Sequence, residues 1–170
     1  MRASSVIVIS GSMGAGKSSA LAEASDLLTA AGIVHAAIDL DSLNIAHLPS
    51  IAPEDLMIRN LAAIWNNFAT AGVTRLLIAS AVETAAELDR ICRAVDAART
   101  IVVRLTASIE TMQRRIARRE TGMLEAKFVA RVAELESILN AAHLESFALS
   151  NDSRPITDVA RELLVRAGWL

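Results

Sequence analysis

The feature that most constrains this chain is a glycine-rich segment that follows an apolar run near its start. The apolar run, residues 6–9, reads Val-Ile-Val-Ile, and residues 11–18 read Gly-Ser-Met-Gly-Ala-Gly-Lys-Ser. A helix-like stretch comes next. A strand, the pattern GxxxxGKS and a helix in this order are typical of the P-loop, whose backbone N–H groups wrap phosphate groups at a helix N-terminus. The sequence therefore predicts a site for a nucleoside triphosphate.

The P-loop pattern also predicts what its individual side chains do. We expect Lys17 to reach the outer phosphates, the Ser18 hydroxyl to ligate Mg²⁺ and Ser19 to contact an inner phosphate. A dinucleotide-binding turn would need G-x-G-x-x-G, which the glycine spacing here does not fit. The residues that we expect to bind the nucleotide are Gly11, Ser12, Met13, Gly14, Ala15, Gly16, Lys17, Ser18 and Ser19.

Short apolar runs alternate with helical patterns along the whole chain. The predicted strands are residues 6–10, 34–39, 75–80, 100–105 and 146–150. The predicted helices are residues 17–31, 53–71, 84–98, 108–121, 125–142 and 156–167. Alternating strands and helices favour a parallel sheet with helices on both faces. We therefore expect an α/β protein with the three-layer P-loop NTPase fold, a five-stranded parallel sheet and one domain over residues 1–170.

Charge and hydropathy exclude several classes of partner. The chain has 170 residues, 53% of them hydrophobic, and a net charge of −2. This charge gives no electrostatic basis for binding nucleic acid or an anionic membrane. No apolar run approaches the roughly 20 residues that a membrane-spanning helix needs. We expect a soluble, cytoplasmic protein that binds neither nucleic acid nor membrane.

Two carboxylates follow the second predicted strand. The sequence there reads Asp39-Leu40-Asp41-Ser42, and ligands of parallel α/β sheets collect beyond the carboxyl ends of the strands. A hydroxyl that accepts a phosphoryl group needs an orienting or basic carboxylate near the γ-phosphate, and the metal needs acceptors around its ligands. The alternative is a structural turn or a helix cap made by Asp41. We favour a catalytic role for both carboxylates.

These two motifs together resemble the small P-loop phosphotransferases. Adenylylsulfate kinases carry D-x-D-N and chloramphenicol phosphotransferases carry D-S after the second strand, and gluconate and shikimate kinases share the general plan. In that group the acidic residue after the second strand approaches the substrate hydroxyl, a role that the resemblance carries best onto Asp41 and next onto Asp39. It also implies ATP and Mg²⁺ as cofactors, and a monomer or homodimer.

A helix after the fourth strand carries four arginines opposite an apolar stripe, at positions 114, 115, 118 and 119. In the resembling kinases such a helix leads into a lid whose arginines clamp the transferred phosphate, and guanidinium groups suit its charge. The resemblance implies Arg115, Arg118 and Arg119 as clamp candidates in a short lid around residues 114–124. The alternative is a solvated helix face, which a Glu110–Arg114 pair would support.

The loop after the fifth strand, residues 150–155, borders the adenine in the resembling kinases. Arg154 is a candidate to stack on the base, and a capped turn without a ligand is the alternative.

The third strand lacks the aspartate that many motor and switch NTPases place at its end; Ser80 and Glu83 stand there instead. The sequence as a whole favours a kinase that phosphorylates a hydroxyl of a small molecule. A regulatory nucleotide-binding module and, less favoured, a nucleic-acid end kinase are the alternatives. The acceptor itself stays open, because fold does not fix substrate.

Overall fold

The computed structural model describes residues 4–46, 48–119 and 123–170, with the side chains of Arg119 and residues 123–125 outside the described part. The described residues form one parallel sheet with the strand order β2-β3-β1-β4-β5. The strands are β1 (Ser4–Ser10), β2 (Ala36–Asp39), β3 (Arg75–Ala79), β4 (Ala97–Thr106) and β5 (Phe147–Ser150). The P-loop strand is therefore central, and its carboxyl end lies between the ends of β3 and β4.

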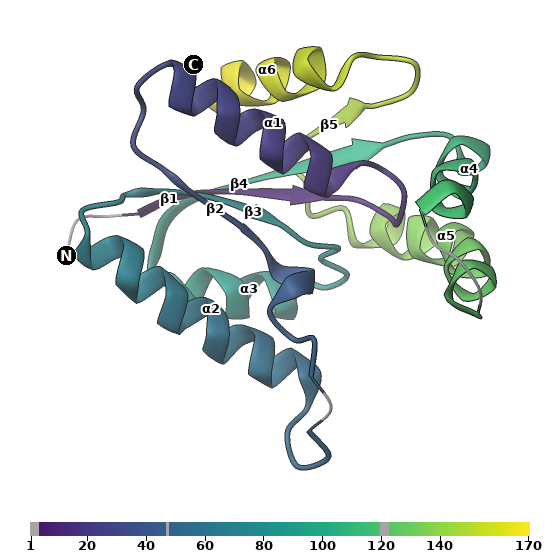
Figure 1. Cartoon of the computed structure of the whole chain (residues 1–170), viewed down its shortest axis with the longest axis horizontal. Coiled ribbons are helices and arrows are strands. Elements are labelled where there is room, and N and C mark those ends of the chain that lie inside the picture. Colours follow the sequence, from purple (N-terminus) through teal and green to yellow (C-terminus); the bar gives the residue numbers. More distant parts are fainter. Residues whose placement is uncertain (1–3, 47, 120–122) are drawn as a thin grey trace.

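Helices cover both faces of this sheet (Figure 1). On one face lie α1 (Lys17–Ala30) and α6 (Ile156–Ala167); on the other lie α2 (Pro53–Thr70) and α3 (Ala85–Ala94). The helix α4 (Ile109–Arg119) packs on α5 (Met123–Ala142) beside the carboxyl ends of β1 and β4. This arrangement confirms the predicted α/β class with a five-stranded parallel sheet. Across the described residues, no helix combines the length and the apolar character needed to span a bilayer.

The apolar run of β1 is buried on both sides, which explains why it shows no polar alternation. Successive strand side chains point to opposite faces. Accordingly, Ile7 and Ile9 pack into the core beneath α1 and α6, whereas Val6 and Val8 pack into the core beneath α2 and α3. All four are fully buried. Burying a side chain of this size contributes about 1.5–3 kcal/mol. Because its side chains alternate between the two cores, β1 stabilises both.

The predicted helix over residues 84–98 is wrong at its end, and the predicted strand over 100–105 starts too late. Helix α3 ends at Ala94, and β4 already begins at Ala97. Asp96 adopts a left-handed conformation with φ of 47°, which stops the helix. The Ser4 hydroxyl donates to the carbonyls of Val95 and Asp96, and Ser4 pairs with Ala97 in the sheet. Ser4 lies more than 90 positions before Val95, Asp96 and Ala97 in the sequence. These long-range contacts therefore override the local helical pattern.

Other predicted bounds shift less. Strand β2 begins at Ala36 instead of Val34; the Val34 side chain is largely exposed, whereas Ala36 and Ile38 are buried. The predicted lid around 114–124 begins within α4, but residues 120–122 lie outside the described part.

A buried ion pair fixes the base of α5 to the sheet. The Arg104 guanidinium on β4 donates to Glu136 at 2.7 Å and to the Asn140 amide oxygen at 2.9 Å. The two charged side chains are only 5% and 14% exposed. The Arg104 Nε and the Glu136 Oε1 are buried without a hydrogen-bond partner. Such a pair gives little net stability, but breaking it by removing one partner leaves an uncompensated buried charge.

We expect Arg104→Met to destabilise the protein by about 3–5 kcal/mol, because Glu136 would stay buried without its cation. The double variant Arg104→Met/Glu136→Leu removes both charges and should recover most of this loss. Urea unfolding followed by circular dichroism measures both. A double variant as unstable as the single one would show that the ion pair itself, and not the orphaned charge, carries the stability.

Candidate functional site

The P-loop connects β1 to α1 and lies in close contact with other backbone segments. Gly14 and Gly16 have φ of 77° and 98°, values that residues with a Cβ rarely adopt. A Cβ on Gly14 would lie 2.5 Å from the Met112 carbonyl oxygen, and one on Gly16 would lie 2.3 Å from the Asn151 amide nitrogen. The sequence therefore needs glycine at both positions for conformation and for space.

The first turn of α1 faces an open hollow. Helix N-termini leave their first N–H groups without intrahelical partners, and Gly16, which precedes Lys17, provides no side-chain cap. A hollow of about 250 Å³, here called the P-loop hollow, lies against this turn. It is lined by Met13, Gly14, Gly16, Lys17, Ser18, Ser19, Asp41, Arg115 and Ile116. The Lys17 ammonium donates to the Ser12 carbonyl oxygen at 3.2 Å, so it lies over the loop.

Three of the predicted P-loop residues support the loop from behind and do not line the hollow. Gly11, Ser12 and Ala15 are buried. The Ser12 hydroxyl points to the carbonyl oxygen of Val132 on α5, at 3.4 Å. This arrangement therefore disfavours a contact between the Ser12 side chain and a nucleotide.

The Ser18 hydroxyl meets the first of the two predicted carboxylates. It donates to Asp39 Oδ2 at 2.5 Å, while Oδ1 of the same carboxylate accepts from the Asp41 backbone N–H at 3.2 Å. Asp39 ends β2 and caps the 3₁₀ turn Leu40–Ser42. Its carboxylate thus has a structural role in the turn and also contacts the predicted metal-ligating hydroxyl. The sequence alone did not single out this contact.

Asp41 is the middle residue of this turn. Its side chain lines the P-loop hollow together with Lys17 and Ser18. The turn is held by the Ser42 hydroxyl, which donates to the Asp39 carbonyl oxygen at 2.7 Å. The Asn60 amide of α2 donates to the Leu43 carbonyl oxygen at 2.6 Å, which fixes the following segment. The structure therefore brings both predicted carboxylates to the P-loop.

Arg115 is the predicted arginine that lies at the P-loop. Its guanidinium donates to the Gly14 carbonyl oxygen at 3.1 Å and to the Asn151 carbonyl oxygen at 2.7 Å. Both contacts join α4 to the loops beside the hollow. This places Arg115 on the wall of the P-loop hollow and gives it a structural role that the sequence did not predict.

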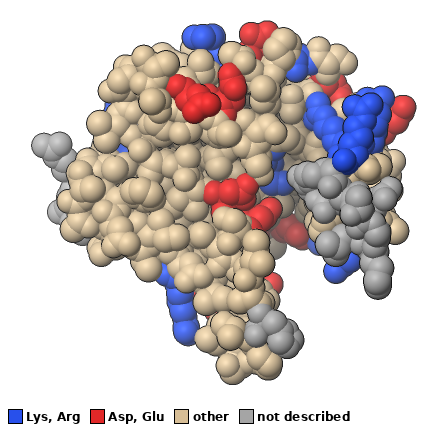
Figure 2. All heavy atoms as spheres, viewed as in Figure 1, with Lys and Arg blue, Asp and Glu red and all other residues tan. Residues whose placement is uncertain are grey.

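Arg114 and Arg118, the other arginines of α4 whose side chains the structure describes, do not line the P-loop hollow. Figure 2 shows basic side chains gathered over α4, apart from acidic ones in the middle of the same face. Arg118 is exposed and is not among the residues that line the P-loop hollow. The Arg119 side chain lies outside the described part of the chain, so its predicted role stays a prediction.

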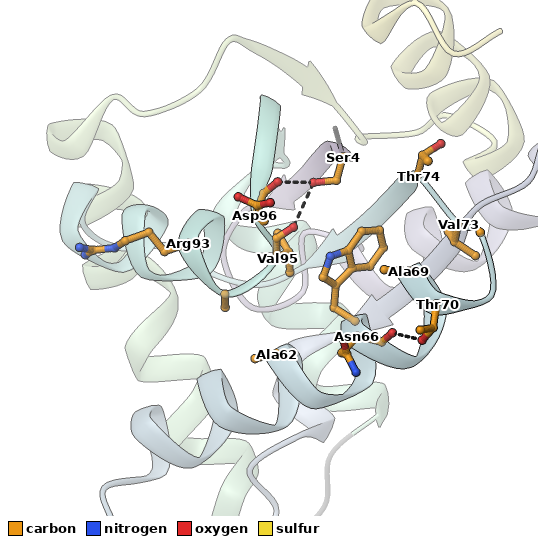
Figure 3. A pocket seen from close by; sticks show the side chains of 13 residues that line it. Ser4, Ala62, Asn66, Ala69, Thr70, Val73, Thr74, Arg93, Val95 and Asp96 are labelled. Carbon is orange, nitrogen blue, oxygen red and sulfur yellow. Dashed lines mark hydrogen bonds between the residues drawn. The ribbon is translucent and has the colours of Figure 1, made fainter. Parts of the chain in front are cut away.

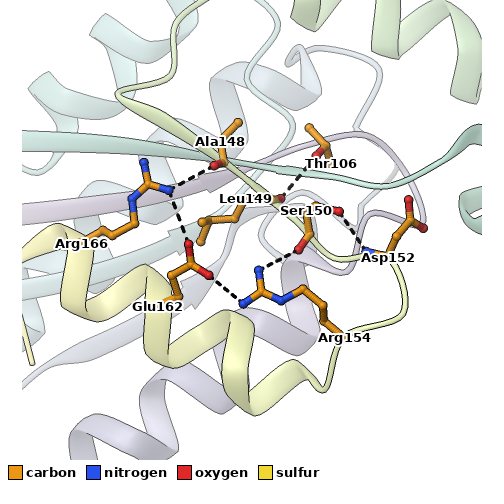
Figure 4. Close-up of polar contacts among 8 residues, drawn as sticks. All are labelled: Thr106, Ala148, Leu149, Ser150, Asp152, Arg154, Glu162 and Arg166. Carbon is orange, nitrogen blue, oxygen red and sulfur yellow. Dashed lines mark hydrogen bonds and ion pairs between the residues drawn. The ribbon is translucent and has the colours of Figure 1, made fainter.

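Arg154 contacts residues that are close to it in the sequence, at the end of β5 and on α6 (Figure 4). It donates to Glu162 of α6 at 2.7 Å and to the Ser150 carbonyl oxygen at 3.3 Å. The hydrogen bond from Arg154, which opposes a smaller effect of burial, holds the pKa of Glu162 below its usual value. Arg166 approaches the same carboxylate at 3.6 Å. Arg154 does not line the P-loop hollow, and its stacking on a base stays a prediction.

Asn151 is a site residue that the sequence analysis missed. Its buried side-chain amide donates to the Ala15 carbonyl oxygen at 2.7 Å, across 136 residues of sequence. The next residue, Asp152, accepts from the Ser108 N–H at 2.6 Å, just before α4. The available signal was its place directly after β5, at the same edge of the sheet as the P-loop. This position indicates that Asn151 lies near the P-loop, but it does not indicate which group Asn151 contacts.

A second hollow opens at the same edge of the sheet, between the first turns of α2 and α3. This α2–α3 hollow has a volume of about 270 Å³ and is lined by Glu54, Met57, Ile58, Thr84, Ala86, Glu87 and Arg90. Thr84 and Glu87 cap α3: the Thr84 hydroxyl accepts from the Glu87 N–H, and Glu87 accepts from the Glu83 N–H. Burial raises the pKa of Glu87, and the negative charge of Glu83 adds to this shift.

A third hollow, of about 340 Å³, lies at the opposite edge of the sheet (Figure 3). Ser4, Thr74 and Asp96 line it, and each stands at or just before the start of a strand. Because the P-loop follows the other end of β1, this hollow is remote from the predicted phosphate site.

Comparison with known proteins gives structural matches only. No family model and no curated protein sequence matches the chain. The tunicamycin resistance protein of Deinococcus radiodurans is 15% identical and has a TM-score of 0.68, with 98% of this chain and 97% of that one covered. A gluconokinase of Sinorhizobium meliloti is 18% identical with a TM-score of 0.64, covering 99% and 94%.

An APS kinase of Mycobacterium tuberculosis, solved in complex with AMPPNP and APS, is 16% identical with a TM-score of 0.57; the match covers 96% of each chain. The structural neighbours of this chain thus include P-loop small-molecule kinases. At such low identities the matches show that the chain shares their fold over nearly its full length. They leave its substrate open.

We expect Asn151→Ala to weaken the P-loop, because the Ala15 carbonyl oxygen would lose its buried donor. The free energy of unfolding should fall by about 1–3 kcal/mol, and the Kd for Mg²⁺–ATP should rise. Urea unfolding and calorimetric titration measure the two effects. The matched control is Asn67→Ala on the exposed side of α2, for which a change within about 0.5 kcal/mol is expected. Equal effects of both variants would contradict the role of Asn151.

Proposed function

We propose that this protein is an ATP-dependent phosphotransferase that transfers the γ-phosphate of Mg²⁺–ATP to a hydroxyl group of a small molecule. The observation that carries the proposal is the meeting of Ser18, Asp39 and Asp41 at the P-loop. A phosphate-binding loop alone would fit many nucleotide binders. Two carboxylates beside its hydroxyl residue supply what the transfer to a hydroxyl needs.

The residues present fit a magnesium nucleotide. The uncapped first turn of α1 offers N–H groups and a partial positive charge to phosphate oxygens. Mg²⁺ prefers oxygen ligands and is usually held by few protein groups together with substrate phosphates. The Ser18 hydroxyl would provide one ligand, and its hydrogen bond to Asp39 orients it. Bound Mg²⁺ would supply positive charge at the transferred phosphoryl group.

The chain's own side chains then divide the remaining work. Lys17 lies at the hollow and would offset the charge of the outer phosphates. Asp41 lines the same hollow without taking part in the Ser18 hydrogen bond. It would orient the acceptor hydroxyl and receive its proton as the new oxygen–phosphorus bond forms and ADP departs. The kinases of the same fold named above support a kinase over a regulatory nucleotide-binding module.

The first experiment measures binding and turnover with the same protein. Mg²⁺–ATP at 100 times its Kd should stabilise the fold by about 2.7 kcal/mol, and ADP should form only when a hydroxyl acceptor is added. Lys17→Ala should lower turnover by about 10²–10³-fold. Binding of ATP without acceptor-dependent ADP in any metabolite mixture would favour the regulatory module instead. Salt-sensitive binding to oligonucleotides would favour the nucleic-acid end kinase.

The two carboxylates should separate in their effects. Asp39→Asn should raise the Mg²⁺ concentration needed for half-maximal activity by about 10–100-fold, because Asp39 contacts the residue that would ligate the metal. Asp41→Asn should lower kcat by on the order of 10²-fold or more and leave the Kd for ATP nearly unchanged. Steady-state kinetics at varied Mg²⁺ distinguishes the two patterns. An Asp41→Asn variant with full kcat would remove the proposed base.

A further inference from the structure

Arg90 lines the α2–α3 hollow, and Arg131 contacts Glu83, the residue before Thr84 of the lining; both arginines already hold carboxylates. Arg90, which lines the hollow, forms an ion pair with Asp55. Arg131 of α5 donates to both carboxylate oxygens of Glu83 at 3.2 Å and pairs with Glu134 at 2.7 Å. Glu83 follows β3 at the edge where the P-loop lies. Arg90 and Arg131 are thus each engaged by a carboxylate of the same chain.

The same hollow also presents carboxylates. Glu54 and Glu87 line it, and Glu54 is exposed in the first turn of α2. Met57, Ile58 and Ala86 provide the apolar part of the lining. On the side toward the P-loop, Asp41 lines the neighbouring hollow. The lining of the α2–α3 hollow thus holds two carboxylates beside the already paired Arg90, whereas the cations Lys17 and Arg115 line the P-loop hollow, where the phosphates of ATP would lie.

This space lies where an acceptor would have to enter. The α2–α3 hollow and the P-loop hollow both lie beyond the carboxyl ends of β1, β2 and β3, which are neighbours in the sheet. The hydrogen bond from Asn60 to Leu43 keeps α2 next to the segment that follows Asp41. An acceptor whose hydroxyl meets Asp41 can extend toward α2 and α3.

A carboxylate, sulfate or phosphate on an acceptor is best recognised by arginine, which offers two parallel donors. Here such a group would have to displace Asp55 from Arg90 and would face Glu54 and Glu87 at the same time. Both requirements act against an anion. An uncharged group or an amine does not compete for the arginine and is not repelled by the carboxylates. An amine is in addition attracted by Glu54 and Glu87.

We infer that the acceptor is an uncharged or cationic hydroxyl compound that carries no carboxylate, sulfate or phosphate group. The inference rests on the proposed kinase function and names the substrate class of that site. It separates this chain from kinases whose acceptors are acids, with which it shares only the fold.

The first test divides a heat-treated small-molecule extract on an anion-exchange resin. ADP formation from ATP is then measured with the unretained and the retained fractions, and the rate of the Lys17→Ala variant is subtracted. The inference predicts acceptor activity in the unretained fraction. Activity confined to the retained, anionic fraction would overturn the inference and leave the kinase function intact. No activity in either fraction, with Mg²⁺–ATP binding intact, would reject both.

The second test addresses the ion pair directly. Asp55→Asn removes the carboxylate that pairs with Arg90 in the lining of the α2–α3 hollow, so sulfate should compete with the acceptor about fivefold more strongly than in the parent protein. The assay uses the active fraction at saturating ATP, which suppresses competition at the P-loop. Glu110→Gln, in the exposed first turn of α4, is the matched control. Thermal stabilisation by Mg²⁺–ATP verifies that both variants fold. Sulfate inhibition of the parent protein that is measurable and as strong as that of Asp55→Asn would show that the native α2–α3 hollow already accepts anions.

Discussion

The site depends on the close contact between the P-loop and the two segments that hold it in place. Gly14 lies against the backbone of α4 at Met112, and Gly16 lies against the side chain of Asn151 after β5. Hydrogen bonds from Asn151 to Ala15 and from Arg115 to Gly14 complete the contact. Because a loop that wraps phosphates must direct its own N–H groups inward, its carbonyl oxygens need donors from elsewhere in the chain. Asn151 is the donor for the Ala15 carbonyl oxygen and Arg115 for that of Gly14, whereas the Ser12 carbonyl oxygen accepts from Lys17 of the same motif.

The order of strands in the sheet distributes the candidate functional residues among the ends of neighbouring strands. β1 leads into the loop that would hold phosphates, and β2 leads into the turn that carries Asp39 and Asp41. β3 lies between them and leads into Glu83 and the cap of α3. In the proposed function, phosphate binding, proton transfer and acceptor recognition would thus depend on different strand ends. The acceptor side can change in sequence without disturbing the P-loop, which agrees with the variety of kinases that share this fold.

The sequence predicted the features that depend on local patterns. The P-loop, the five strands and the class of fold follow from apolar runs and glycine spacing, and the structure confirms the fold. The sequence patterns could not predict the start of β4. The end of α3 and the start of β4 depend on hydrogen bonds from Ser4 to Val95 and Asp96, more than 90 residues away. The structural role of Arg115 was hidden for the same reason, since its partners Gly14 and Asn151 are 101 and 36 residues distant. Likewise, the pattern Asp-x-Asp did not reveal which carboxylate would contact Ser18.

The fixed first half of α4 limits how this protein can close over a ligand. The start of the helix is held through Ser108 by Asp152, Met112 lies under Gly14, and Arg115 bonds to two carbonyl oxygens. Ile116, one residue later, is fully buried. A swing of the entire helix would break all of these contacts at once. A motion of α4 toward a ligand that keeps these contacts would have to bend the helix beyond Ile116, so the last turn of α4 is the part of this helix that can move independently of the P-loop.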